Sequence, residues 1–120
     1  MISMIRKFNF DYDYENDDLF LYDSKSKSKG SIEIDDLVID FNSDKEVSAI
    51  ELSKATSFLK SVGEWVDKEL LKEIQGCQID ITQKNNFLVL KLTLQFKTKP
   101  SLTTPVIVPT INEPSPALAY

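Results

Sequence analysis

The sequence predicts an α+β fold, a mainly antiparallel sheet of about seven short strands with one kinked helix or two helices inserted before the last hairpin. Three observations support it. Apolar residues alternate with polar ones over much of the chain, the spacing becomes helical between residues 55 and 74, and short turn sequences separate the runs. The 120 residues are 42% hydrophobic and 28% charged, as in one folded domain. We expect this domain to span residues 1–97 and residues 98–120 to form a proline-rich extended tail.

The first half of the chain has the pattern of five short strands. In the first of them, aromatic residues alternate with polar ones, which predicts one buried face: Phe8, Phe10, Tyr12 and Tyr14. Together with the apolar run at 19–22, this strand predicts a hairpin over residues 7–23. Residues 24–31, S-K-S-K-S-K-G-S, predict an exposed loop because they contain no apolar side chain. A second hairpin follows over residues 32–41, and a turn then leads to a strand at 47–52.

The segment after residue 52 has helical periodicity. Ser53 suits an N-cap, and seven apolar residues then share one helical stripe: Ala55, Phe58, Leu59, Val62, Val66, Leu70 and Ile74. Gly63 interrupts the stripe and the S-V-G-E sequence at 61–64 matches a capping box, so one kinked helix and two helices are both open. Gly76 would end the segment. A hairpin over residues 77–97, with apolar residues at alternate positions, is expected to cover it.

All five prolines lie in the C-terminal segment, from Pro100 to Pro116. Prolines at this spacing predict neither a helix nor a central strand. The segment also carries apolar side chains on a backbone whose prolines lower the entropy cost of docking. Trp65 is expected to be a core anchor, with an interaction role as the alternative. The candidate interaction residues are therefore Trp65 and six tail residues: Val106, Ile107, Val108, Ile111, Leu118 and Tyr120. The sequence leaves open whether the tail docks on its own chain or on another.

Charge and cysteine content limit the classes of partner. The net charge is −5; residues 1–52 carry six basic and thirteen acidic side chains, and residues 53–120 carry eight and six. Direct nucleic-acid binding is not expected, because it needs clustered Lys and Arg. Membrane insertion is not expected either, because the apolar runs are far shorter than the ~20 residues of a span. Cys77 is the single cysteine and no secretory leader is evident, which predicts a cytoplasmic location.

Residues 10–56 contain an opening tyrosine-aspartate hairpin and a later strand ending in I-E-L-x-x-A. The positions are Tyr12, Asp13, Asp17, Leu19, Phe20, Ile39, Asp40, Val47, Ile50, Glu51, Leu52 and Ala55. On these residues the segment resembles domain-of-unknown-function family 2283, a family of small prokaryotic proteins, and the resemblance extends weakly to residue 97. The glycine often found before the fifth strand is replaced by N-S-D-K at 42–45. The resemblance implies the same fold and a small protein partner, and it implies no catalytic residue.

Acidic residues at alternate positions 11, 13, 15 and 17 invite comparison with a calcium loop. That loop requires a glycine and a glutamate at its twelfth position, where this chain has Tyr22, and acids along a strand splay apart. The Asp35-Asp36 pair is expected to be a solvated turn, and Cys77 has no histidine in the chain to activate it. The sequence therefore predicts no catalytic residue, no metal site and no cofactor.

These features favour a non-enzymatic protein-interaction module that acts as a self-associating or partner-binding subunit. It would use the acidic half of the sheet and the apolar C-terminal tail, with a protein partner or a homo-oligomer as the result. Two alternatives stay open. One is a small carboxylate- or metal-dependent enzyme, and the other is an acidic antitoxin-like partner of a basic toxin, which charge complementarity would favour.

Overall fold

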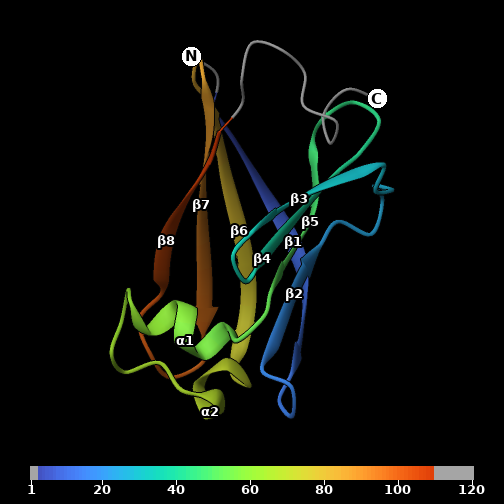
Figure 1. Ribbon diagram of the computed structural model, residues 1–120. Helices are drawn as coiled ribbons and strands as arrows, with labels where there is room; N and C mark the ends of the chain where they lie inside the picture. The colour runs from blue at the N-terminus through green and yellow to red at the C-terminus, as the bar shows by residue number, and fades with distance from the viewer. Residues whose placement is uncertain (1–2, 110–120) are drawn as a thin grey trace.

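Eight strands and two short helices follow one another in residues 3–109, the part of the chain that the computed structural model describes (Figure 1). The strands are β1 (Ser3–Asp13), β2 (Asp18–Tyr22), β3 (Gly30–Ile34), β4 (Leu37–Phe41), β5 (Val47–Leu52), β6 (Ile74–Gln83), β7 (Phe87–Phe96) and β8 (Leu102–Pro109). The helices α1 (Ala55–Lys60) and α2 (Lys68–Leu71) lie between β5 and β6. The predicted α+β class with a mainly antiparallel sheet is confirmed, although the sheet has eight strands rather than about seven.

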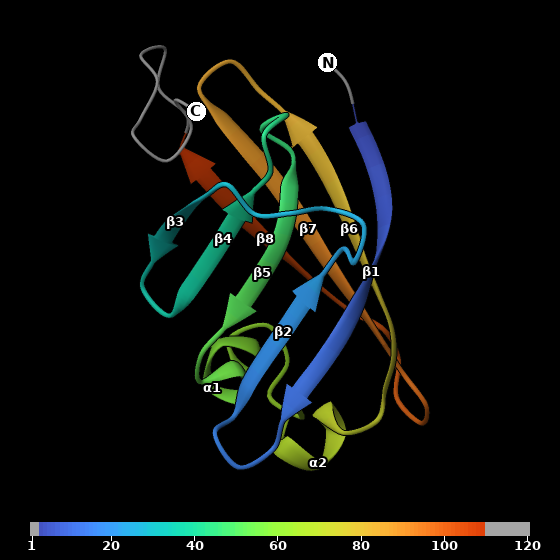
Figure 2. The same cartoon turned by 90° about the vertical axis from the view of Figure 1, so that its right-hand side faces the viewer.

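The eight strands form one sheet in the order β3-β4-β5-β2-β1-β6-β7-β8, and each neighbouring pair is antiparallel. The longest strand, β1, joins the two halves of the sheet. Its residues 3–8 pair with β6 and its residues 9–13 pair with β2. The sheet curls, so that β3, β4, β5 and β2 face β6, β7 and β8 across the interior (Figures 1 and 2).

The core fills the space between the two halves of the sheet. Alternate side chains of a strand point to the same face, and the inward ones form one continuous cluster to which both helices also contribute. Its fully buried members include Leu19, Ile39, Ile50, Ile79 and Leu90. The helices cover one end of this interior (Figure 1). The two edge strands remain apart, and a groove of about 750 Å³ lies between the β3–β4 turn, α1 and β8.

The helical segment consists of two helices, which was one of the two open alternatives. The predicted N-cap Ser53 is wrong, because the cap position of α1 is Lys54, with φ 52° and no side-chain cap bond. A residue far away in the sequence caps the N-terminus of α1 instead. The Asp17 carboxylate, in the β1–β2 turn, accepts the backbone N–H of Thr56 at 3.2 Å. A distant carboxylate therefore satisfies a helix N–H that Ser53 was expected to satisfy.

The second helix also begins and ends elsewhere than predicted. Its cap is Asp67, whose side chain accepts the backbone N–H of Leu70 at 2.8 Å, rather than the S-V-G-E sequence at 61–64. Gly76 does not end a helix, because it lies within β6. The apolar stripe alone does not distinguish one kinked helix from two helices. Val66 belongs to the stripe and is buried, although it lies in the connection between α1 and α2.

The predicted domain boundary at residue 97 is wrong, because residues 102–109 form β8. This strand pairs with β7 from Leu102 opposite Leu94 to Pro109 opposite Phe87. An edge strand tolerates proline where the backbone N–H would point away from the neighbouring strand. Pro105 and Pro109 are four residues apart on β8, so their backbone nitrogens point to the same side of the strand. The hairpin of β6 and β7 is thus not the last pairing of the sheet. Residues 110–120 of the expected tail lie outside the described residues.

Asn42 organises the turn between β4 and β5. Its side-chain oxygen accepts the backbone N–H groups of Asp44 and Glu46, each at 2.9 Å. The neighbouring Lys45 has φ 63°, a left-handed conformation that favours glycine. No residue of the turn at 42–45 is a glycine.

Replacing Lys45 with glycine should therefore stabilise the protein by roughly 0.5–1 kcal/mol, since the left-handed strain of an L-residue disappears. Chemical denaturation of the purified variant measures this change. Ser43→Gly is the matched control, because Ser43 lies in the same turn without a positive φ and should lose stability through the greater entropy of the unfolded chain. Equal changes in the two variants would contradict the explanation.

Candidate protein-interaction surface

The outer face of one half of the sheet collects acidic side chains from five strands. The inward residues of β1 to β5 are buried or packed half-buried against the core, so the residues between them point outward. Among the outward positions of residues 9–13 and of β2 to β5, none is basic. We call this surface the acidic face, and it comprises Asp11, Asp13, Asp18, Glu33, Asp40 and Glu51 with the apolar side chains Phe20, Tyr22 and Val38. Figure 2 presents this half of the sheet toward the viewer.

One row of the acidic face crosses all five strands in register. Its members, from β1 to β3, are Asp11, Phe20, Glu51, Val38 and Glu33. Adjacent strands lie about 4.8 Å apart, so carboxylates and apolar side chains alternate at that interval across the sheet. Phe20 stands between two carboxylates with 39% of its surface exposed.

An aromatic pair forms the centre of the acidic face. The rings of Phe20 and Tyr22, two residues apart on β2, stack with centroids 5.2 Å apart and an interplanar angle of 20°. Both strands that flank β2 are paired with it, so the backbone beneath the rings is held on each side. Within residues 3–109, none of the six surrounding carboxylates takes part in an ion pair. The face therefore combines a fixed apolar platform with carboxylates that form no ion pair among the described residues.

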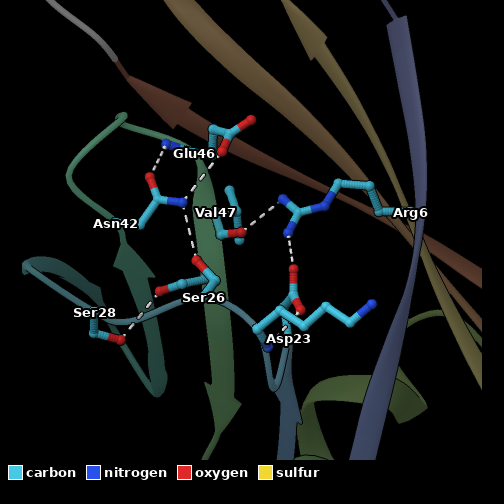
Figure 3. A network of polar contacts seen from close by, with 9 residues as sticks. Arg6, Asp23, Ser26, Ser28, Asn42, Glu46 and Val47 are labelled. Carbon is cyan, nitrogen blue, oxygen red and sulfur yellow. Dashed lines mark hydrogen bonds and ion pairs between the residues drawn. The ribbon is translucent and has the colours of Figure 1, made fainter.

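The lysine-rich loop at 24–29 borders one end of the acidic face, and a polar network holds it there (Figure 3). Ser28 donates a hydrogen bond to Asp40 at 3.0 Å, and the Asn42 amide donates one to the Ser26 hydroxyl at 2.9 Å. Arg6, from β1, pairs with Asp23 at the start of the loop. The backbone N–H of Lys25 and the Arg6 guanidinium lower the pKa of the Asp23 carboxyl. The lysines thus mark a fixed boundary between positive and negative surface.

The early acids diverge, as the strand periodicity predicts. Asp11 and Asp13 point outward from β1, and hydrogen bonds from Asn16 lower the pKa of Asp13. Asp17 turns instead toward Tyr12 and α1, and accepts the Tyr12 hydroxyl at 2.5 Å. Across residues 3–109, no group of three or more potential ligands is placed to hold a metal ion.

Cys77 lies on the inner face of β6 and is buried. Burial raises the pKa of its thiol to about 12. The sulfur is therefore protonated at neutral pH, and the reactive thiolate form is disfavoured.

The residues predicted for interaction have different environments. Trp65 is 43% exposed and meets the Phe96 ring edge-on, with centroids 6.1 Å apart. Val106 and Val108 are not available to a partner, because they point inward from β8 and belong to the core. Ile107, between them, points outward and is 59% exposed. The last three predicted residues lie outside the described part of the chain: Ile111, Leu118 and Tyr120.

The apolar members of the acidic face are the residues that sequence reasoning missed. The run D-L-F-L-Y at 18–22 reads as a compact apolar strand, but only Leu19 and Leu21 point inward. The signal in the sequence is the polar residue Asp18 at the start of the run. Alternate residues of a strand lie on one face, so Phe20 and Tyr22 share the outward face of Asp18. The cross-strand register that places Glu51 beside Phe20 has no signal in the sequence.

Comparisons of the chain with protein-family models, with curated proteins and with solved structures give no match. No helix in residues 3–109 is long and apolar enough to cross a membrane.

Proposed function

We propose that this protein is a non-enzymatic interaction module whose acidic face binds a basic surface of a partner protein. The observation that carries the proposal is the registered row of Asp11, Phe20, Glu51, Val38 and Glu33. Aromatic side chains supply contact area at interfaces and lose little conformational entropy there. The carboxylates around them select a cationic partner and accelerate its association.

A nucleic-acid-binding protein is the class of partner that this surface suits best. Such a protein already presents Lys and Arg side chains to a polyanion, and the acidic face offers them carboxylates in place of phosphates. This is the behaviour of an antitoxin-like subunit toward a basic toxin. The lysine loop at 24–29 would repel the same partner at one border, so charge also orients the complex.

Loss of the central ring should weaken partner binding about tenfold or more. Phe20→Ala removes the exposed anchor, and truncation of such a residue costs at least ~1.4 kcal/mol. Glu51→Lys places a cation in the centre of the row and should weaken binding further through repulsion. The full-length chain and each variant are immobilised, and the basic proteins that they retain from an extract of the native host are quantified. The purified partner is then titrated against each variant.

A variant with the same change in net charge shows whether binding depends on the acidic face or only on the net charge of the chain. Glu64→Lys makes the same change at an exposed position between the helices, and it should bind as the unmodified chain does. Recovery should also fall when salt is raised from low to high concentration, because screening weakens exposed charges. Equal recovery by Glu51→Lys and by the unmodified chain would show that the acidic face is not the binding surface.

A further inference from the structure

The outer face of the β7–β8 hairpin is apolar and almost uncharged. Its outward side chains, which we call the neutral face, are Phe87, Val89, Lys91 and Thr93 on β7 with Thr103, Pro105, Ile107 and Pro109 on β8. Lys91 is the one charged member. The register places Val89 opposite Ile107 and Phe87 opposite Pro109, so the apolar side chains are contiguous. Ile107 is 59% exposed, and Phe87 and Val89 beside it are half-buried. Contiguous apolar side chains at a surface indicate a contact site.

We propose that a second copy of this chain docks on the neutral face, so that two hairpins pack sheet against sheet. Charge supports this occupant. The chain carries a net charge of −5, and its other broad outer surface, the acidic face, would repel itself. The neutral face carries one charged side chain, Lys91, and Asp80 of β6 lies beside it in the register, so two copies can meet there with little net charge between them.

The proline positions indicate packing of faces rather than addition of a strand. The β7–β8 ladder runs without a shift from Leu102 to Pro109, so Pro105 and Pro109 occupy positions whose N–H would point to the free edge. Two of the donors that an added strand would require are therefore missing. Prolines on an edge strand are a known protection against edge pairing.

The neutral face is also complementary to itself. A two-fold axis parallel to the strands, between β7 and β8, places Val89 of one copy over Ile107 of the other and Phe87 over Pro109. Lys91 then lies opposite the uncharged Pro105, and the two Lys91 side chains take diagonal positions across the axis, each beside Asp80 of its own β6 in the register. Two sheet faces packed in this way lie about 10 Å apart, which matches side chains of this size.

The dimer would leave the acidic faces free. In Figure 2 the strands β7 and β8 lie behind β2, β4 and β5, so the neutral and acidic faces are on opposite sides of the molecule. Two acidic faces would point outward from one dimer, and binding to a multivalent partner would gain from avidity. The inference goes beyond the proposed partner binding and does not depend on it.

The test is the mass of the full-length chain in solution. Sedimentation equilibrium or light scattering across micromolar to millimolar concentrations should show a concentration-dependent approach to twice the 13.7 kDa chain mass. Ile107→Glu should raise the dimer dissociation constant at least a hundredfold, because dimerisation would bury an unpaired carboxylate. Ile107 is already exposed in the single chain, so folding should be unaffected, as a thermal melt can verify. Val62→Glu makes the same change at an exposed position near α1 and should dimerise normally.

Three results would overturn the proposal. The first is a monomer at every concentration, and the second is a dimer that Ile107→Glu does not weaken. The third is tighter association of a chain ending at Pro109, since residues 110–120 would then be the occupant of the neutral face. Glu51→Lys should retain the dimer whether or not it loses a partner, so failure of partner binding and failure of dimerisation remain distinguishable.

Discussion

Removal of residues 100–120 should abolish cooperative folding, because it deletes a strand that completes the core. Leu102, Val106 and Val108 are at most 7% exposed and pack against the inner face of β7. Burying each such side chain contributes about 1.5–3 kcal/mol, so their joint loss approaches the roughly 5–15 kcal/mol that stabilises a whole domain. Thermal and denaturant unfolding of the truncated chain should show no sharp transition.

A second truncation provides the control. A chain ending at Pro109 retains every described contact of the sheet and should unfold cooperatively, with a midpoint close to that of the full chain. Val108→Ala should lie between these cases and lose about 1–3 kcal/mol, since its side chain is fully buried. A chain ending at Lys99 that melts as sharply as the full chain would show that β8 does not contribute to the core.

Asp17→Ala should destabilise the protein by about 3 kcal/mol, because one carboxylate joins the β1–β2 turn, β1 and α1. It accepts the Tyr12 hydroxyl at 2.5 Å and the Thr56 hydroxyl at 2.7 Å. The main-chain carbonyl of Asp17, which alanine would retain, accepts the Ala55 N–H at 2.9 Å. Hydrogen bonds to a charged group are worth about 1.5–3 kcal/mol, and the half-buried donors would lose their partner. Denaturant unfolding measures the loss, and Asp36→Ala, at an exposed turn, should change stability little.

The same carboxylate predicts a pH dependence. Burial opposes ionisation of Asp17, but the hydrogen bonds from Tyr12 and Thr56 outweigh it and lower the pKa of Asp17. A lowered pKa stabilises the fold above the unfolded value of about 3.9, and this contribution is lost as pH falls through the folded pKa. Asp17→Asn removes this titration, so its stability should fall less steeply than that of the unmodified chain below about pH 4. Parallel acid profiles for the two proteins would contradict this role.

Most strands of the sheet can be predicted from the sequence, because burial of one face of a strand requires apolar residues at every second position. The alternation of Leu88, Leu90, Leu92 and Leu94 predicts the inner face of β7, and all four are buried. The tail was misread for a related reason. Its prolines argue against a helix and a central strand, and β8 is neither, because it is an edge strand whose residues alternate as those of β7 do. An edge position, which is a property of the sheet and not of the segment, makes those prolines acceptable.

The sequence predicts the proposed interaction surfaces less completely than the strands. The excess of acid in residues 1–52 is visible in the sequence, and so are the exposed positions of Asp11 and Asp13 on β1. The pairing of Phe20 with Glu51 was not visible, because it depends on β2 inserting between β1 and β5. The sequence predicts the same role for Ile107, Val106 and Val108, whereas only Ile107 points outward.

The sequence by itself determined which residues alternate, where the chain turns and which half carries the negative charge, since each depends on near neighbours along the chain. The tertiary structure decided the strand order, the helix cap supplied by Asp17 and the division of the outer surface into an acidic face and a neutral face. These arise from contacts between residues far apart in the sequence, and local side-chain preferences do not determine which distant strands pair.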